Sequence, residues 1–495
     1  MLFNSHVFIL LFLPLTLIIF FGLAKFRLTL AAMIWLVATS LFFYAYWNVA
    51  YLPLLVISIL TNFFIGRTLS RTEHGSQQAK LLLISGVCIN LGFIGYYKYA
   101  GFLAQSMNGI LNTDLPVPNI VLPLAISFYT FTQIAYLVDA YRGETKKYGV
   151  LEYSLFVSFF PQLIAGPILR HDELIPQFWQ KRKFIFSDRN FARGLTLFTL
   201  GLSKKMLIAD RLSPWVADVF DHASQVSFVE AWVGALCYTL QLYFDFSGYS
   251  DMAIGLGWMF NIELPINFDS PYKATSIADF WRRWHITLSN FLRDYLYIPL
   301  GGNRKGELRR NLNLMITMFL GGLWHGAGWT FVVWGGLHGL YLVIDRQWQR
   351  LRIKLPWFLA WFITFFAVVM SWILFRSTSF QDAAFMIQSV TGMKGIVLPG
   401  KFESLLSWLT PLGVEFKGQE VLSALPYLPG TDATTLGINL GTIIALLALV
   451  IWCPNTQEIM EKFQPKWWWA VGAGTMVFVC LLSLNQVSEF LYFQF

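Results

Sequence analysis

Apolar runs long enough to cross a lipid bilayer recur along this chain of 495 residues. A membrane-spanning helix needs about 20 mostly apolar residues. Hydrophobic residues make up 56% of the sequence and charged residues only 13%, whereas soluble domains carry about 25% charged residues. The expected spans lie near residues 7–24, 28–50, 51–66, 81–97, 117–140, 194–210, 229–246, 312–345, 356–376, 436–453 and 467–482.

This pattern predicts an all-α polytopic membrane protein with about 11 transmembrane helices, each close to the length that a bilayer requires. The whole chain, 1–495, is expected to form one integral-membrane domain. Its first apolar run lacks the basic start and small-residue cleavage site of a removable signal peptide, so we expect that run to remain as an anchor. The four cysteines show no CxxC spacing, and neither a disulfide framework nor a metal site is predicted.

The basic residues predict the orientation of the chain, because Lys and Arg concentrate in short cytoplasmic loops. The formal net charge is +8. Segments 142–147 and 170–193 are both basic, so both are expected on the cytoplasmic side, and the apolar run 150–166 between them is not expected to cross. Its prolines and glycine favour a re-entrant or interfacial segment, and a short kinked helix is the alternative.

Segment 377–435 differs from its surroundings in composition, with several prolines and glycines among Leu and Trp. The basic loop at 346–354 is expected inside, which places 377–435 outside the membrane. An external loop region that docks a partner is one interpretation, and a simple connector is the other.

A charged segment, 279–298, is expected to form an amphipathic helix with Trp281 and Leu288 on its apolar stripe. Arg282 and Arg293 fall within about 20° of each other on the opposite face at about 100° per residue. They are predicted to bind the phosphate-bearing end of a donor, although contact with lipid headgroups is an alternative. His285 falls at the edge of the apolar stripe and is expected to point into the protein, either as a site residue or as a buried histidine with a hydrogen bond.

Glycines and tryptophans surround His325 in the string GGLWHGAGW. Such a density of glycine weakens a helix and marks close approach of backbone to backbone or to a ligand. His338 falls about 220° away from His325 on a continuous helix, and is therefore predicted to be structural.

Several long strings resemble the membrane-bound O-acyltransferases, and within them the bacterial alginate O-acetyltransferase branch. They are FYTFTQIAYLVDAYRGE, FFPQLIAGPILR, QLYFDFSGYSDMAIGLG, FWRRWHITLSNFLRDYLYIPLGGNR, GGLWHGAGWTFVVWGGLHG and the terminal FLYFQF. The resemblance implies that His325 is catalytic and that His285 is its companion. It further implies a multi-pass protein of the bacterial inner membrane with a central tunnel, acetyl-CoA as the cytoplasmic donor, and a periplasmic acetyltransferase partner that modifies an exported polysaccharide such as alginate.

A neutral imidazole suits the removal of a proton from an attacking hydroxyl, and the oxyanion that follows needs hydrogen-bond donors. We therefore expect His325 to be the general base and His285 to position groups or stabilise the oxyanion. Four polar residues are expected either to line the tunnel or to form hydrogen bonds between helices: Tyr243, Asp245, Tyr249 and Asp251.

Other functions stay open at this point. Peptidoglycan or cellulose acetylation, D-alanyl transfer to teichoic acid, a lipid acyltransferase and a non-enzymatic polytopic transporter would all place helices and charges in a membrane. The chain lacks the motifs of phosphate-binding loops, zinc peptidases and serine hydrolases. Membrane lipids are expected partners, and nucleic acid is not.

Overall fold

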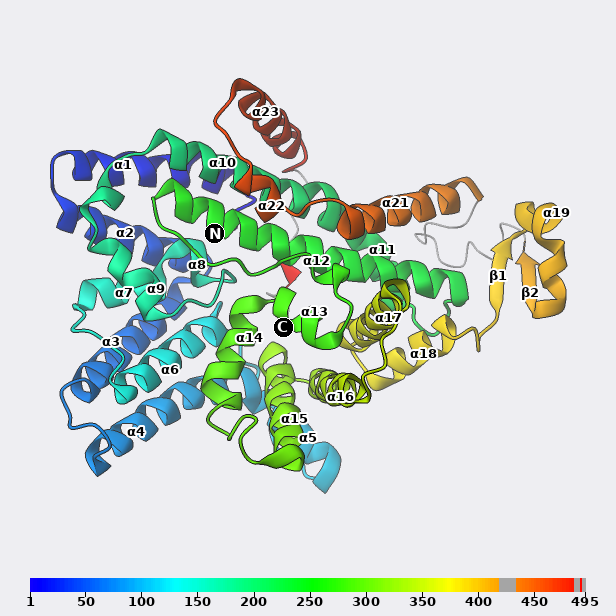
Figure 1. Ribbon diagram of the computed structural model, residues 1–495, viewed down its shortest axis with the longest axis horizontal. Helices are drawn as coiled ribbons and strands as arrows, with labels where there is room; N and C mark the ends of the chain where they lie inside the picture. Colours follow the sequence, from blue (N-terminus) through cyan, green and yellow to red (C-terminus); the bar gives the residue numbers. More distant parts are fainter. Residues whose placement is uncertain (418–432, 485–489, 492–495) are drawn as a thin grey trace.

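The computed structural model describes residues 1–417, 433–484 and 490–491, which are mostly helical (Figure 1). The prediction of a helical fold is confirmed in its main part, with two short strands in addition. Within these residues, four helical segments are long and apolar enough to cross a membrane, namely Val7–Lys25, Val49–Leu69, Gln77–Leu111 and Trp357–Arg376. The count of about 11 spans is not confirmed, since several other apolar runs form shorter, broken or polar-containing helices, which apolar content alone does not distinguish.

Six helices form the N-terminal part: α1 (Leu13–Lys25), α2 (Thr29–Ala45), α3 (Leu52–Leu69), α4 (Gln77–Ile94), α5 (Ala100–Leu111) and α6 (Ile126–Arg142). Proline stands in the first turn of α1 and of α3, where its missing N–H costs no hydrogen bond. The side chain of Ser76 caps α4 by accepting from Ala79 N at 3.1 Å. A π-helical turn, Gly95–Tyr99, joins α4 to α5.

The second part consists of α7 (Val150–Ser158), α8 (Phe160–Leu163), α9 (His171–Phe178), α10 (Asp188–Ser203), α11 (Asp210–Asp221) and α12 (Phe228–Met259). The run 150–166 is broken at Phe159 and turns back through buried residues. The run is therefore not one continuous helix, because Pro161 and Gly166 interrupt it, and the expectation that it does not cross the membrane stays a prediction.

The long helix α12 runs through the middle of the molecule and packs against α10 at glycine pairs (Figure 1). A Cβ at Gly194 would stand 2.5 Å from Gly255 O, and a Cβ at Gly248 would stand 2.7 Å from Gly201 O. No side chain fits at these positions without separating the helices. Small residues allow this backbone-to-backbone approach where the surroundings are apolar.

The third part contains α13 (Ile277–Arg283), α14 (Ile286–Leu292), α15 (Gly306–His325), α16 (Trp329–Leu351), α17 (Trp357–Arg376) and α18 (Phe380–Val390). The prediction of one helix over 279–298 is wrong, because His285 adopts a left-handed conformation with φ of 45° that separates α13 from α14. The expected span 312–345 is also divided, since α15 ends at His325 and α16 begins at Trp329.

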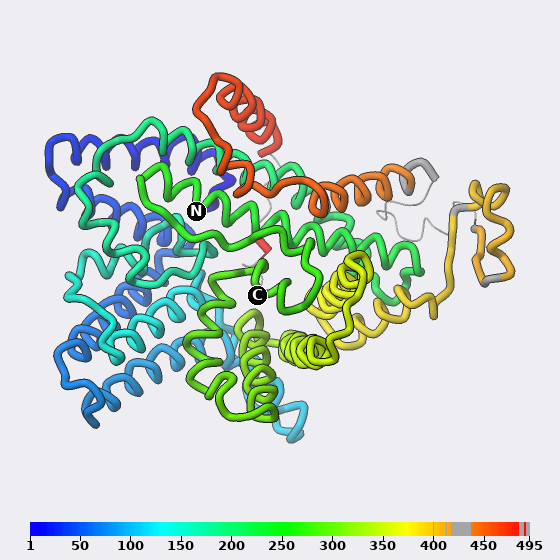
Figure 2. Tube along the Cα trace, viewed as in Figure 1, coloured from blue at the N-terminus to red at the C-terminus, as the bar shows by residue number. Residues whose placement is uncertain are grey.

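The C-terminal part holds two parallel strands, β1 (Ile396–Pro399) and β2 (Val414–Lys417), with α19 (Glu403–Leu406) between them, followed by α21 (Ala433–Trp452), α22 (Thr456–Glu461) and α23 (Trp467–Leu482). The predicted external region 377–435 thus contains α18 and both strands, while 418–432 lies outside the described residues. Phe490 and Leu491 return to α12, where Leu491 N donates to Asp245 Oδ2 at 3.0 Å (Figure 2).

Candidate active site

The break between α13 and α14 fixes His285 inside the protein. His285 is fully buried, and its ring lies 4.7 Å from the ring of Phe246 between centroids. Asn267 Oδ1 accepts from Thr287 N at 3.1 Å and lies 3.3 Å from His285 Nδ1. Because a backbone N–H can only donate, this Asn267 atom is the oxygen, and His285 Nδ1 therefore carries the proton.

His325 is the last residue of α15, and glycines bring α15 against α16 at this point. A Cβ at Gly322 would meet the backbone of Phe331 and stand 3.0 Å from Gly335 Cα. The close backbone approach predicted from the glycines is confirmed. The His325 ring is buried among aromatic rings, with centroids 4.9 Å from Trp324, 5.2 Å from Trp334 and 5.5 Å from Phe375.

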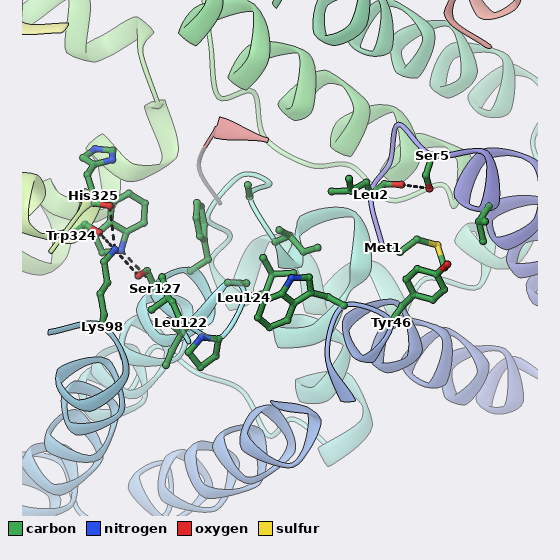
Figure 3. A pocket seen from close by; sticks show the side chains of 18 residues that line it. Met1, Leu2, Ser5, Tyr46, Lys98, Leu122, Leu124, Ser127, Trp324 and His325 are labelled. Carbon is green, nitrogen blue, oxygen red and sulfur yellow. Dashed lines mark hydrogen bonds between the residues drawn. The ribbon is translucent and has the colours of Figure 1, made fainter. Parts of the chain in front are cut away.

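The two predicted catalytic histidines come together in the fold. The ring centroids of His285 and His325 are 6.4 Å apart, and Trp324 lies beside both rings. His325 also lines a cavity of about 560 Å³ whose other walls come from the N-terminus, the end of α2, segment 122–128 and segment 164–165 (Figure 3). The arrangement places His325 beside a space large enough for part of a substrate, with its imidazole on the side of the backbone away from Lys98 (Figure 3).

Lys98 also faces this cavity and lies outside the predicted site residues (Figure 3). Its Nζ donates to Trp324 O at 2.6 Å, to His325 O at 3.2 Å and to Ser127 Oγ at 3.3 Å. The expected span ended at residue 97 and so excluded this lysine. A lysine within a long apolar helix is the signal that could have identified it, since such residues mark functional sites by default.

His338 has both ring nitrogens in hydrogen bonds. Trp281 Nε1 donates to its Nδ1 at 3.3 Å, and its Nε2 lies 2.9 Å from Ser371 Oγ. His338 joins α13, α16 and α17 within a group of tryptophans. These contacts support the predicted structural role, although the continuous helix assumed between His325 and His338 is absent.

Arg282 and Arg293 do not lie on one helix, because Arg282 belongs to α13 and Arg293 to a later π-helical turn. The geometric argument that they form one basic strip therefore no longer holds. Arg293 Nε donates to Asp294 Oδ1 at 2.7 Å, and Arg282 is exposed. Their assignment to donor binding stays a prediction without support from a common helix face.

Asp245 and Asp251 serve as ion-pair partners between helices. Lys205 Nζ lies 2.7 Å from Asp245 Oδ1, and Lys204 Nζ lies 2.7 Å from Asp251 Oδ2. Tyr249 stacks on Phe490 at 4.6 Å, and Tyr243 packs against Tyr272 at 5.4 Å. Polar contacts between helices are observed for Asp245 and Asp251, whereas for Tyr243 and Tyr249 both interpretations stay predictions.

A second polar cluster surrounds the buried carboxylate of Asp139 on α6. Tyr295 donates to Asp139 Oδ2 at 2.7 Å, and His171 Nε2 lies 3.3 Å from the same atom. Burial raises the pKa of Tyr148, whose hydroxyl oxygen lies 2.7 Å from His171 Nδ1. The cluster connects the broken segment 150–171 to the helices after His285. The described residues contain no group of three or more His, Cys, Asp or Glu side chains arranged to hold a metal ion.

The sequence model of the MBOAT, membrane-bound O-acyltransferase family, matches residues 9–381. The chain belongs to this family. It is therefore a membrane-bound acyltransferase, and a non-enzymatic transporter is no longer an alternative. The matched residues include α15, His285 and His325.

Relatives in two acetyltransferase groups are similar to the chain. A peptidoglycan O-acetyltransferase of Helicobacter pylori is 39% identical in an alignment of length 528, gaps included, that covers 100% of this chain and 98% of the relative. A probable alginate O-acetylase of Azotobacter vinelandii is 44% identical over 77% of this chain and 76% of the relative. A teichoic acid D-alanyltransferase of Streptococcus thermophilus is 29% identical over 46% of this chain and 57% of the relative.

Proposed function

We propose that this protein moves acetyl groups from a cytoplasmic donor, acetyl-CoA, across the bacterial inner membrane for O-acetylation of a cell-envelope polysaccharide. The observation that carries the proposal is the approach of two buried imidazoles, His285 and His325, to 6.4 Å between ring centroids, beside a cavity that His325 lines. Over such a distance one small acyl group and one hydroxyl can contact both rings.

In the proposed chemistry His325 is the general base. It takes the proton of an attacking hydroxyl while the hydroxyl oxygen forms a bond to the acyl carbon, and the carbon–sulfur bond of the thioester then breaks. The proton passes from His325 to the leaving sulfur, so the imidazole returns to its neutral state. His285 has its proton on Nδ1, and its Nε2 accordingly carries a lone pair in the neutral ring. This tautomer favours positioning of the hydroxyl over donation to the oxyanion.

The distribution of charge supports access of the acceptor from outside the cell. Residues that line the cavity stand at one end of α1, α2 and α6, for example Ser5, Tyr46 and Ile126. Exposed basic residues stand at the other end, for example Lys25 and Arg142. Because basic loops favour the cytoplasm, the cavity faces the periplasmic side in this orientation, and the donor reaches His325 from the opposite side.

Two polymers are candidate acceptors. Alginate is suggested by relatives of 42–44% identity that cover about three quarters of the chain, and peptidoglycan by a relative that covers all of it. D-alanyl transfer has less support, since the relative with that name covers under half of the chain. A periplasmic acetyltransferase that receives the acetyl group and modifies the polymer is the proposed partner.

A deletion strain complemented with wild-type protein or His325→Ala tests the proposal. Ester-linked acetate is released from isolated exopolysaccharide and, separately, from peptidoglycan. We expect the wild-type protein to restore acetate in one fraction, which identifies the polymer, and His325→Ala to restore none while reaching the membrane in equal amount. Normal acetate with His325→Ala would remove this histidine from the mechanism.

A further inference from the structure

The end of α15 that carries His325 is held by two consecutive residues from a π-helical turn. This turn, Gly95–Tyr99, lies within the continuous helical segment Gln77–Leu111. Single π-helical turns inside long helices are rare and often occur at functional sites. Here the turn presents the side chains of both Lys98 and Tyr99 to the same neighbouring helix end.

The two side chains bind three successive backbone carbonyls. Tyr99 OH donates to Leu323 O at 2.7 Å, and Lys98 Nζ donates to Trp324 O at 2.6 Å and to His325 O at 3.2 Å. The last carbonyls of a helix have no partner within the helix, and a cation at this end is favoured by the helix dipole. Residues 98 and 99 therefore form a clamp on the last turn of α15.

All three N–H donors of the Lys98 ammonium have acceptors in or beside this clamp. An ammonium has three N–H donors, and its third acceptor is Ser127 Oγ on α6 at 3.3 Å. Figure 3 shows the lysine side chain reaching toward the backbone of Trp324 and His325, with Ser127 beside it and the imidazole on the other side of that backbone. A ligand in the cavity would have to displace one of these bonds to reach the amine.

We propose that Lys98, assisted by Tyr99, is a positioning residue that fixes the backbone of His325 so that its imidazole meets the reacting groups. This inference rests on the proposed function, since it assigns the catalytic base to His325. Without the clamp, the carbonyls of the last turn of α15 lose their hydrogen-bond donors. That turn can then fray, which moves the His325 imidazole. A displacement of about 1 Å at a catalytic group costs on the order of 10²-fold in rate.

The test compares full-length variants reconstituted in vesicles, with acetyl-CoA titrated at a fixed acceptor concentration. Lys98→Met keeps the length of the side chain and removes its donors, Lys98→Arg keeps donors and charge, and Tyr99→Phe removes one hydroxyl. Lys80→Met, an exposed lysine at the start of the same helical segment, is the matched control. We expect Lys98→Met to lower kcat by on the order of 10²-fold with KM for the donor unchanged, Tyr99→Phe to lower it less, and Lys98→Arg to restore most of it.

Melting temperature in detergent and a double variant separate positioning from a general loss of structure. If Lys98→Met acts through His325, adding it to His325→Ala lowers the residual rate no further. A normal kcat in Lys98→Met, or an equal loss in Lys80→Met, would overturn the inference. If Lys98→Met fails to reach the membrane, Tyr99→Phe decides, and an unchanged kcat in that variant also overturns it. An active His325→Ala protein would instead contradict the proposed function, so the two failures are distinguishable.

Discussion

His285 and His325 stand with ring centroids 6.4 Å apart although one directly precedes α14 and the other ends α15. Both positions are helix termini, where the backbone leaves its regular path and a side chain can be aimed independently of helix periodicity. Different contacts hold the two histidines: the buried amide of Asn267 holds His285, and the clamp of Lys98 and Tyr99 holds His325. Each set of contacts can be removed by substitution without changing the other.

The amide of Asn267 is expected to be needed for activity because it fixes the tautomer and the loop of His285. Asn267→Ala should lower kcat by on the order of 10²-fold, as for other small displacements of a catalytic group, and His285→Ala by at least as much. Asn290→Ala, an exposed residue on α14, is the control. Losses that multiply in the Asn267→Ala, His285→Ala double variant would show that the two residues act separately.

The glycine contacts between α10 and α12 are expected to be required for stability. Gly201→Leu should lower the free energy of unfolding by about 1–3 kcal/mol or more through overpacking, since its Cβ would meet the backbone of Gly248. Gly22→Leu on α1 has open space around it and should have little effect. Thermal melting of both variants in the same detergent provides the measurement, and equal melting temperatures would contradict the observed packing.

The buried ion pair of Lys205 and Asp245 can be tested by restoring stability with a second substitution. Lys205→Met leaves Asp245 buried without this cation, which costs about 3–5 kcal/mol when one partner of a buried pair is removed. Lys205 also pairs with Asp210 at 2.7 Å, so adding Asp245→Asn removes one of the two carboxylates left without this cation and should recover part of that loss. Stability is measured by melting, and a double variant less stable than Lys205→Met would show that charge burial is not the cause.

The orientation of the chain is testable with single cysteines in a background without the native four. Cysteines at Lys146 and Lys181 should be labelled only from the cytoplasmic side, because both lie in the basic segments that flank 150–166. Lys181 is preferred to Lys183, which is largely buried and pairs with Glu263 at 3.0 Å. A cysteine at Asp114, in the loop before the cavity segment 122–128, should be labelled only from outside. Labelling of 146 and 181 from opposite sides would mean that 150–166 crosses the membrane.

The sequence alone determined the class of this protein, because composition and the length of apolar runs depend on the solvent and not on contacts between segments. It also predicted a site at His325 and His285, whose motif strings are local, and the interruption of 150–166, since proline breaks a helix wherever that helix packs. The helix predicted over 279–298 was wrong, and the count of about 11 spans is not confirmed, for the same reason. Periodicity describes a segment in isolation, whereas the turn at His285 exists because Asn267 and the core hold it.

Only the tertiary structure decided which residues meet. The approach of His285 to His325, the clamp by Lys98 and Tyr99, and the pairing of Asp245 with Lys205 each join segments that are distant in the chain. Such contacts depend on where whole helices cross, and the crossings depend on packing at a few positions such as Gly201 and Gly322. Local propensities and charge patterns carry no information about those distances, so the geometry of the site had to come from the fold.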